Sequence, residues 1–180
     1  MTLEEAFSTV RDPRRAQGQR ISHIQLLSIV IISNLCGYLG GRAVARFAKA
    51  HSKTFTELLK LKHGVPSHVT ISGLINRLDQ QEMINAFNSW ASSFVKLAGE
   101  DAVSGDGKAL GSTVSNAHGQ TQNFQAIVSL FTQKSGLVYS LETYRNKKES
   151  EIDVVRLLCS RLKDMGVTIF LDALHTQKNS

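Results

Sequence analysis

The chain lacks the residues that would support a disulfide framework or a thiolate metal site. It has two cysteines, Cys36 and Cys159, which lie in apolar helical surroundings and form no CxxC pair. Disulfides are rare in reducing compartments, and isolated thiols in apolar segments are typical of packed interiors. The sequence therefore predicts two buried free thiols and a cytoplasmic protein.

Long hydrophobic runs are also missing. The most apolar stretch, residues 24–39, is interrupted by Gln25, Ser28 and Ser33. It is too short to span a bilayer comfortably, so it predicts a buried core helix and no membrane partner. Acidic residues occupy the start of the chain, where a secretory signal would carry an apolar run.

Positive charge is concentrated in the first half of the chain. Residues 1–98 carry 12 Lys or Arg against 6 Asp or Glu, and residues 99–180 carry 9 of each, so the whole net charge of +6 falls in the first half. A basic half beside a neutral half that bears carboxylates suggests that one part holds a polyanion and the other acts on it. A solubilising surface is the alternative interpretation.

Residues 1–98 show helical periodicity, which predicts an all-helical N-terminal domain. Capping and breaking residues divide it into helices at about 3–10, 22–37, 42–50, 54–61, 68–78 and 80–98. The last helix has an apolar stripe that predicts core packing: Met83, Phe87, Trp90, Phe94 and Leu97.

The cations of this domain suggest contact with DNA. The fourth and fifth helices resemble a helix-turn-helix by spacing alone, although two helices and a Gly-Pro turn occur in any helical domain. The candidate DNA-binding side chains lie in an early loop, on the third helix and on the fifth: Arg14, Arg15, Arg42, Arg46 and Arg77. Arg42, Arg46 and Lys49 share one side of their helix. Simple solvation of these charges is the competing interpretation.

Beyond residue 98 the pattern changes to that of an α/β domain. Strand-like runs at 103–107, 124–132, 137–144 and 167–171 surround one amphipathic helix, with Asn146 and Glu149 arranged like a capping box at its start. Strand, strand, strand, helix, strand is the layout of a ribonuclease-H-like core. The overall prediction is an α+β chain with domains at 1–98 and 99–180.

Two aspartates close the first and last strands of this layout. Asp106 and Asp172 could hold Mg²⁺ ions jointly for phosphoryl transfer, provided that their strands are parallel neighbours. Taken alone, Asp106 fits a turn because Asp-Gly is a turn dipeptide, and Asp172 fits a helix N-cap. The case for a metal site depends on both acids occurring in this strand order.

Three motifs form a specific set: Asp106-Gly107-Lys108, Lys148-x-x-Glu151-Ile152, and Asp172-Ala173 followed by Gln177. With them, nearly the whole chain resembles the DDE transposases of bacterial insertion sequences, in the H-repeat-associated group. The resemblance implies a DNA-contacting helical region and a ribonuclease-H-like catalytic domain with Asp106 and Asp172 as catalytic metal ligands. It also implies phosphate contact by Lys108 and an acid near the metals at Glu151, for which a surface salt bridge is equally compatible.

The chain departs from this family in one important respect. The third acid of the family, a glutamate, lies well downstream of Asp172, where this chain has no residues. We therefore expect a truncated, inactive copy that binds the double-stranded terminal repeats of its element and has an incomplete two-metal Mg²⁺ site. A non-catalytic fragment that inhibits full-length transposase is the alternative, and homo-oligomerisation is left open.

Overall fold

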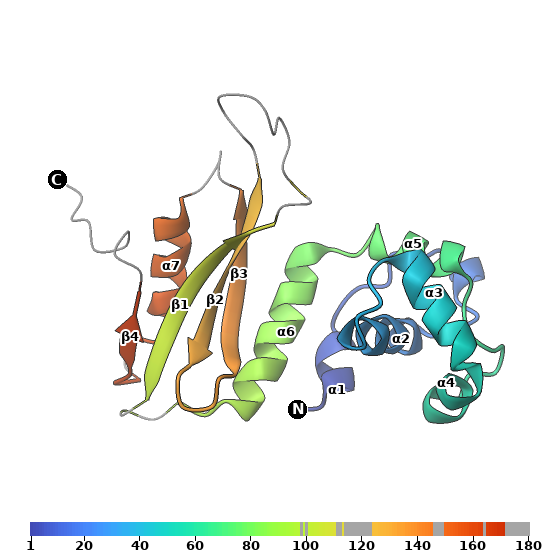
Figure 1. Ribbon diagram of the computed structural model, residues 1–180, viewed down its shortest axis with the longest axis horizontal. Helices are drawn as coiled ribbons and strands as arrows, with labels where there is room; N and C mark the ends of the chain where they lie inside the picture. Colours follow the sequence, from blue (N-terminus) through green and yellow to red (C-terminus); the bar gives the residue numbers. More distant parts are fainter. Residues whose placement is uncertain are drawn as a thin grey trace. The chain divides into compact units, whose positions relative to one another are not determined.

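The computed structural model describes residues 1–97, 99, 101–110, 113, 124–145, 150–163 and 165–171. The chain divides into two compact units, Met1–Ala86 and Phe87–Ser180 (Figure 1). The first unit is helical, and the second contains a four-stranded mixed sheet and a helix. The predicted α+β class is confirmed, while the domain boundary predicted at residue 98 stays a prediction.

The helices of the first unit begin where the sequence supplies caps. They are α1 (Leu3–Phe7), a 3-10 turn (Ala16–Gly18), α2 (His23–Leu35), α3 (Gly41–Ala50), α4 (Ser52–Leu59), α5 (His68–Ile75) and the start of α6 (Gln80–Phe94). Thr2 and Ser22 each form a reciprocal capping box with the residue three positions later. Among the described residues, no helix combines the length and apolar character needed to cross a membrane.

The core of the first unit forms around α2. Leu26 and Ile29 of this helix are fully buried, as are Ile71 and Leu74 of α5. The prediction of a buried helix at residues 24–39 is thus confirmed only for its first part, because α2 ends at Leu35 and both Leu35 and Leu39 are exposed. The predicted burial of Cys36 was wrong: this residue caps the C-terminus of α2 and is exposed, although its thiol is free as expected.

Helix α3 packs closely against α5 because of one glycine. A Cβ atom at Gly41 would lie 3.0 Å from the Cα atom of Ser72 and closer still to its hydroxyl. Only a residue without a side chain fits there, since even a methyl group would overlap the neighbouring helix. The sequence therefore fixes the α3–α5 distance at the first residue of α3.

The apolar stripe predicted on α6 was partly wrong. Phe94 is 61% exposed, and the buried positions are instead aliphatic: Ile84, Ala86 and Ala91. The aromatic rings contact one another along the helix, with 5.9 Å between the Phe87 and Trp90 centroids and 5.3 Å between those of Trp90 and Phe94.

The sheet of the second unit has the strand order β3-β2-β1-β4. Strands β1 (Ala102–Ala109), β2 (Gln125–Thr132) and β3 (Val138–Arg145) are antiparallel neighbours. Strand β4 (Thr168–Phe170) pairs in parallel with β1, with Ala102 opposite Thr168 and Ser104 opposite Phe170. A helical crossover joins β3 to β4, as parallel pairing requires.

That crossover helix, α7 (Glu151–Ser160), covers one face of the sheet (Figure 1). Val154, Val155 and Leu158 pack against Val103 and Val128 in a single apolar cluster. The N-cap is Ser150, whose hydroxyl accepts a hydrogen bond from the Asp153 amide. The capping box predicted from Asn146 and Glu149 involves residues outside the described ranges.

The outer edge of β3 is paired by a side chain. The Asn88 amide of α6 donates to the Leu141 carbonyl and accepts from the Leu141 N–H, both at 2.8 Å. An edge strand leaves such backbone groups unpaired, and an asparagine side chain carries the matching donor and acceptor. Asn88 thus takes the place of a neighbouring strand at this position.

Candidate functional site: a cationic groove and an acid-bearing strand

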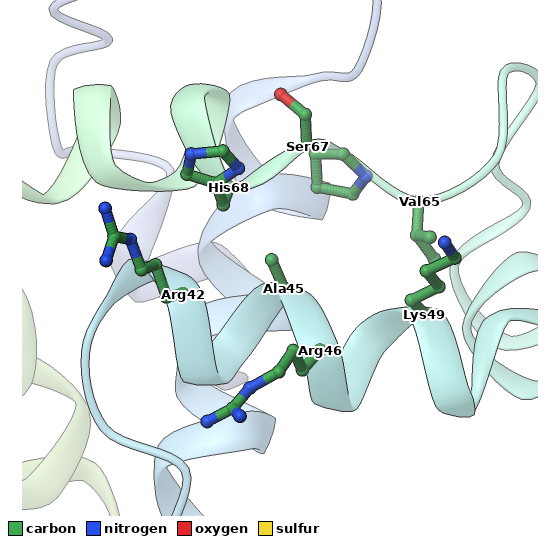
Figure 2. A pocket seen from close by; sticks show the side chains of 8 residues that line it. Arg42, Ala45, Arg46, Lys49, Val65, Ser67 and His68 are labelled. Carbon is green, nitrogen blue, oxygen red and sulfur yellow. The ribbon is translucent and has the colours of Figure 1, made fainter.

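A groove of about 710 Å³ lies between α3 and the start of α5. Its lining combines three cations with a histidine, a hydroxyl and an apolar floor: Arg42, Arg46, Lys49, His68, Ser67, Ala45, Val65 and Pro66. Figure 2 shows Arg42 and His68 on facing sides and Lys49 beneath Val65, while Arg46 points outward from the helix. Gly41, at the start of α3, allows this helix to approach α5 closely.

The groove cations are exposed and carry no counter-charge. Arg42, Arg46 and Lys49 are all exposed, and no salt bridge pairs them with any carboxylate of the described residues. Two of these side chains were DNA-binding candidates from the sequence. Lys49 shares their helical side and lines the same groove, and its spacing of three residues from Arg46 was the signal that could have added it.

The remaining DNA-binding candidates of the first unit lie elsewhere. Arg15 and Arg77 are exposed, and the Arg77 side chain donates to the Gly73 carbonyl. Arg14 is buried, with its side chain only 4% exposed, and its guanidinium binds both oxygens of Asp12 and the Ile21 carbonyl. Arg14 is therefore used within the fold, where it holds an early loop.

Arg14 also controls the protonation of its partner. Burial raises the pKa of the Asp12 carboxyl, but the hydrogen bonds and charge of Arg14, aided by His23, outweigh burial and hold the pKa below the usual 3.8. Burial lowers the pKa of the neighbouring His23. A second hollow of about 540 Å³ begins at this cluster and is lined by Asp12, Arg20, Lys60 and Lys62 among others. Unlike the groove, it contains a carboxylate.

In the second unit, Asp106 lies within strand β1 and is exposed, as is Lys108. Asp106 pairs with Ser129 of β2 and is therefore not part of a turn. Asp172 lies outside the described residues. The parallel, adjacent arrangement of β1 and β4 that the two-acid prediction required is present.

The carboxylate of Glu151 lies against the residue that follows Asp106. A Cβ atom at Gly107 would come within 2.7 Å of the Glu151 Cδ atom. The Tyr144 hydroxyl donates to Glu151 Oε2 at 3.1 Å. Burial, the charge of Glu151 and this hydrogen bond raise the pKa of Tyr144 to about 12. Because successive side chains of a strand alternate, Asp106 points to the face opposite Glu151.

Among the described residues, no group of three His, Cys, Asp or Glu side chains could hold a metal ion. The three predicted ligands cannot be compared as a set, since Asp172 falls outside those residues. Asp106 supplies carboxylate oxygens, the donors that Mg²⁺ prefers. The metal-ligand roles of Asp106, Asp172 and Glu151 stay predictions.

Comparisons with known proteins bear on the helical unit. Residues 4–91 match the family model DDE_Tnp_1-associated. A curated relative, described as an uncharacterized protein in the dhlA 3'region of Xanthobacter autotrophicus, is 28% identical over 176 residues. The alignment covers 96% of this chain and 58% of the relative, so the chain spans less than two thirds of that protein's length. No solved structure matches the chain significantly.

The matched residues include both walls of the groove and most of α6. They confirm the resemblance to transposases that the motifs predicted. Residues 4–91 thus match the DDE_Tnp_1-associated family, which is a transposase-associated family.

Proposed function

We propose that this chain is part of an insertion-sequence transposase in which the helical unit binds the terminal repeats of the element and the sheet supplies ligands for Mg²⁺-dependent DNA strand cleavage and transfer. Asp106 and Asp172 are the proposed metal ligands and catalytic acids. The DDE_Tnp_1-associated domain at residues 4–91 supports the assignment to transposition. The excess of basic residues in the first half supports contact with DNA.

The observation that carries this proposal is the parallel pairing of β1 with β4. The pairing runs from Ala102 opposite Thr168 to Ser104 opposite Phe170. Asp106 follows Ser104 by two residues of sequence, and Asp172 follows Phe170 by two. In sequence, both acids thus lie two positions beyond the last paired residues of neighbouring parallel strands, a spacing that fits a shared metal site.

The strand order supports a ribonuclease-H-like core. Three antiparallel strands are followed by a helix, and the fourth strand lies parallel beside the first. When Mg²⁺ is bound, it can neutralise charge on the attacking and leaving oxygens of a phosphodiester. The chain's own contribution is to hold carboxylate oxygens at the edge where β4 ends beside β1.

The metal site can be tested on the chain directly. We expect Mn²⁺, used as a paramagnetic substitute for Mg²⁺, to bind weakly and to be lost in both Asp106→Asn and Asp172→Asn, as measured by electron paramagnetic resonance. The control is Glu57→Gln, which removes an exposed carboxylate of α4 in the other unit. Equal Mn²⁺ binding by wild type and all three variants would show that Asp106 and Asp172 are not the metal ligands.

A second assay separates a catalytic protein from one that only binds. Duplexes carrying the terminal repeats are incubated with the chain and Mg²⁺, and strand breaks are resolved on denaturing gels. Cleavage that disappears in Asp106→Asn would establish catalysis by this chain alone. Binding without cleavage would favour the non-catalytic alternative, and absence of both activities would refute the proposed function.

A further inference from the structure

We propose that the groove between α3 and α5 is the surface on which this protein binds the phosphate backbone of duplex DNA. The inference rests on the proposed function and deepens it by assigning DNA contact to Arg42, Arg46 and Lys49, with His68 on the facing wall. The backbone is the expected target because the lining offers cations and a hydroxyl over an apolar floor. Such groups fix position on a duplex without reading its sequence.

The charge of the groove is unopposed. None of the eight lining residues is acidic. The three cations of α3 are exposed and make no ion pair with a described carboxylate. By contrast, the guanidiniums of Arg14 and Arg161 are already bound to Asp12 and Glu142 within the protein. Unpaired cations gathered in a hollow are available to a polyanion from outside.

The spacing of the cations suits a nucleic-acid backbone. Arg42 and Lys49 are seven residues apart, which corresponds to about 10 Å along a helix axis. The intervals of four and three residues between the three cations correspond to about 6 and 4.5 Å along the axis, and one DNA strand presents one phosphate per about 3.4 Å of its axis. The row therefore carries less charge per unit length than one DNA strand, so each of its three cations can face a separate phosphate.

The alternative location within the same unit is the hollow lined by Arg20, Lys60 and Lys62. It contains Asp12, whose carboxylate would repel phosphate and is already bound to Arg14. It is also smaller, at about 540 Å³ against 710 Å³. The groove on α3 is thus favoured by both charge and size.

The test compares two variants that each remove three positive charges. The groove variant is Arg42→Gln/Arg46→Gln/Lys49→Gln, and the control variant is Lys53→Gln/Lys60→Gln/Lys62→Gln, which changes exposed lysines outside the groove. Glutamine preserves helix propensity closely, so far-UV circular dichroism and thermal unfolding should match wild type. A fluorescein-labelled random-sequence duplex is titrated with each full-length protein at salt concentrations from about 0.05 to 0.2 M.

We expect the groove variant to lose affinity on the order of 10²-fold at about 0.1 M salt and its log–log salt slope to fall in magnitude by about 2.7, or 0.9 for each phosphate that the variant no longer neutralises. The control variant should show less than a third of that change in slope. An equal effect in both variants, or a greater effect in the control, would assign binding to general charge or to the other hollow and overturn the groove.

Three other outcomes would also overturn the inference, and each contradicts a different step of it. If wild type binds duplex DNA with a strong salt dependence and the groove variant binds identically, the groove is wrong while DNA binding by the proposed transposase stands. If wild type shows no salt-dependent binding, the DNA-binding part of the proposed function fails and the groove fails with it. Competition by polyglutamate as effective as that of DNA at equal charge would overturn the assignment to DNA by showing a general anion surface.

Discussion

The hydrogen bond between Tyr144 and Glu151 makes stability depend on pH in a way that can be measured. The Tyr144 side chain is buried, at 7% exposure, and its hydroxyl donates to the Glu151 carboxylate. Burial, the negative charge of Glu151 and this hydrogen bond raise its pKa from 10.0 to about 12. Ionised Tyr144 is thus disfavoured in the folded protein, because the phenolate would be desolvated beside a carboxylate.

The sign and size follow from proton linkage. Between pH 10.0 and about 12 the unfolded chain releases the Tyr144 proton while the folded protein retains it. The stabilisation is therefore complete below pH 10 and is lost as pH rises through that window. A shift of about two units corresponds to roughly 2.7 kcal/mol, and the slope reaches at most about 1.4 kcal/mol per pH unit.

Two substitutions separate the causes. In Glu151→Gln the carboxylate charge disappears while an acceptor oxygen remains, so the pKa of Tyr144 should fall below 12 but stay above 10.0, since burial persists. In Gly107→Ala the new methyl group would overlap the Glu151 carboxyl and displace it. We expect the pKa of Tyr144 in the double variant Gly107→Ala/Glu151→Gln to be close to its value in Glu151→Gln alone, because both changes remove the same interaction.

Urea denaturation followed by circular dichroism, from pH 9 upward, measures the effect. The free energy of unfolding of wild type is compared with that of Tyr144→Phe at each pH, which cancels the titration of other groups. The difference should shrink as pH rises beyond 10, and in the Glu151→Gln background it should shrink by a smaller amount and level off at a lower pH, because the folded-state pKa lies closer to 10.0 there. A difference that is independent of pH would refute the coupling of Tyr144 to Glu151.

Three further outcomes are expected. Gly41→Ala should lower the free energy of unfolding by about 1–3 kcal/mol and weaken DNA binding, because the methyl group would overlap Ser72 and move α3; unchanged stability by thermal melting would contradict this. Asn88→Ala should cost about 1–3 kcal/mol and speed hydrogen exchange of the Leu141 amide, since two edge groups lose their partners; unaltered protection would argue against it. Asp12→Asn should destabilise the protein above pH 3.8, and the difference from wild type should vanish as pH falls through the lowered pKa of this carboxyl; a difference that persists in acid would show another cause.

The helices and strands could be predicted because their signals are local. Ser22 and Gln25 carry their structural meaning within a few residues, and α2 begins there with a capping box, as expected. Local patterns say less about which face of an element is covered. Phe94 was predicted to be buried because of its spacing and is exposed, while Ile84, Ala86 and Ala91 of the same helix are buried.

The candidate sites depend on contacts between distant segments, which sequence patterns reveal only in part. The spacing of Arg42 and Arg46 placed them on one helical side, but their groove is formed with residues 65–68, which no periodicity connects to α3. Arg14 had the same composition cue as Arg15, and only the packing of the loop shows that it is buried and bound to Asp12. Sequence spacing therefore identifies cations that share a helical face, but it does not identify cations that are buried and paired with a carboxylate within the protein.

The Asp106-Gly107 pair illustrates why a dipeptide must be interpreted in its fold. In isolation it predicts a turn, because glycine accepts a positive φ there. In the structure both residues lie inside β1 and pair with Ser129 and Val128 of β2, and Gly107 is absent from the positive-φ glycines of the described chain. The position requires a residue without a side chain, because the Glu151 carboxyl lies where a Cβ atom would be. Gly107 therefore lets the Glu151 carboxyl lie against β1 beside Asp106, and a larger residue there would displace this carboxyl from the strand that carries the proposed metal ligand.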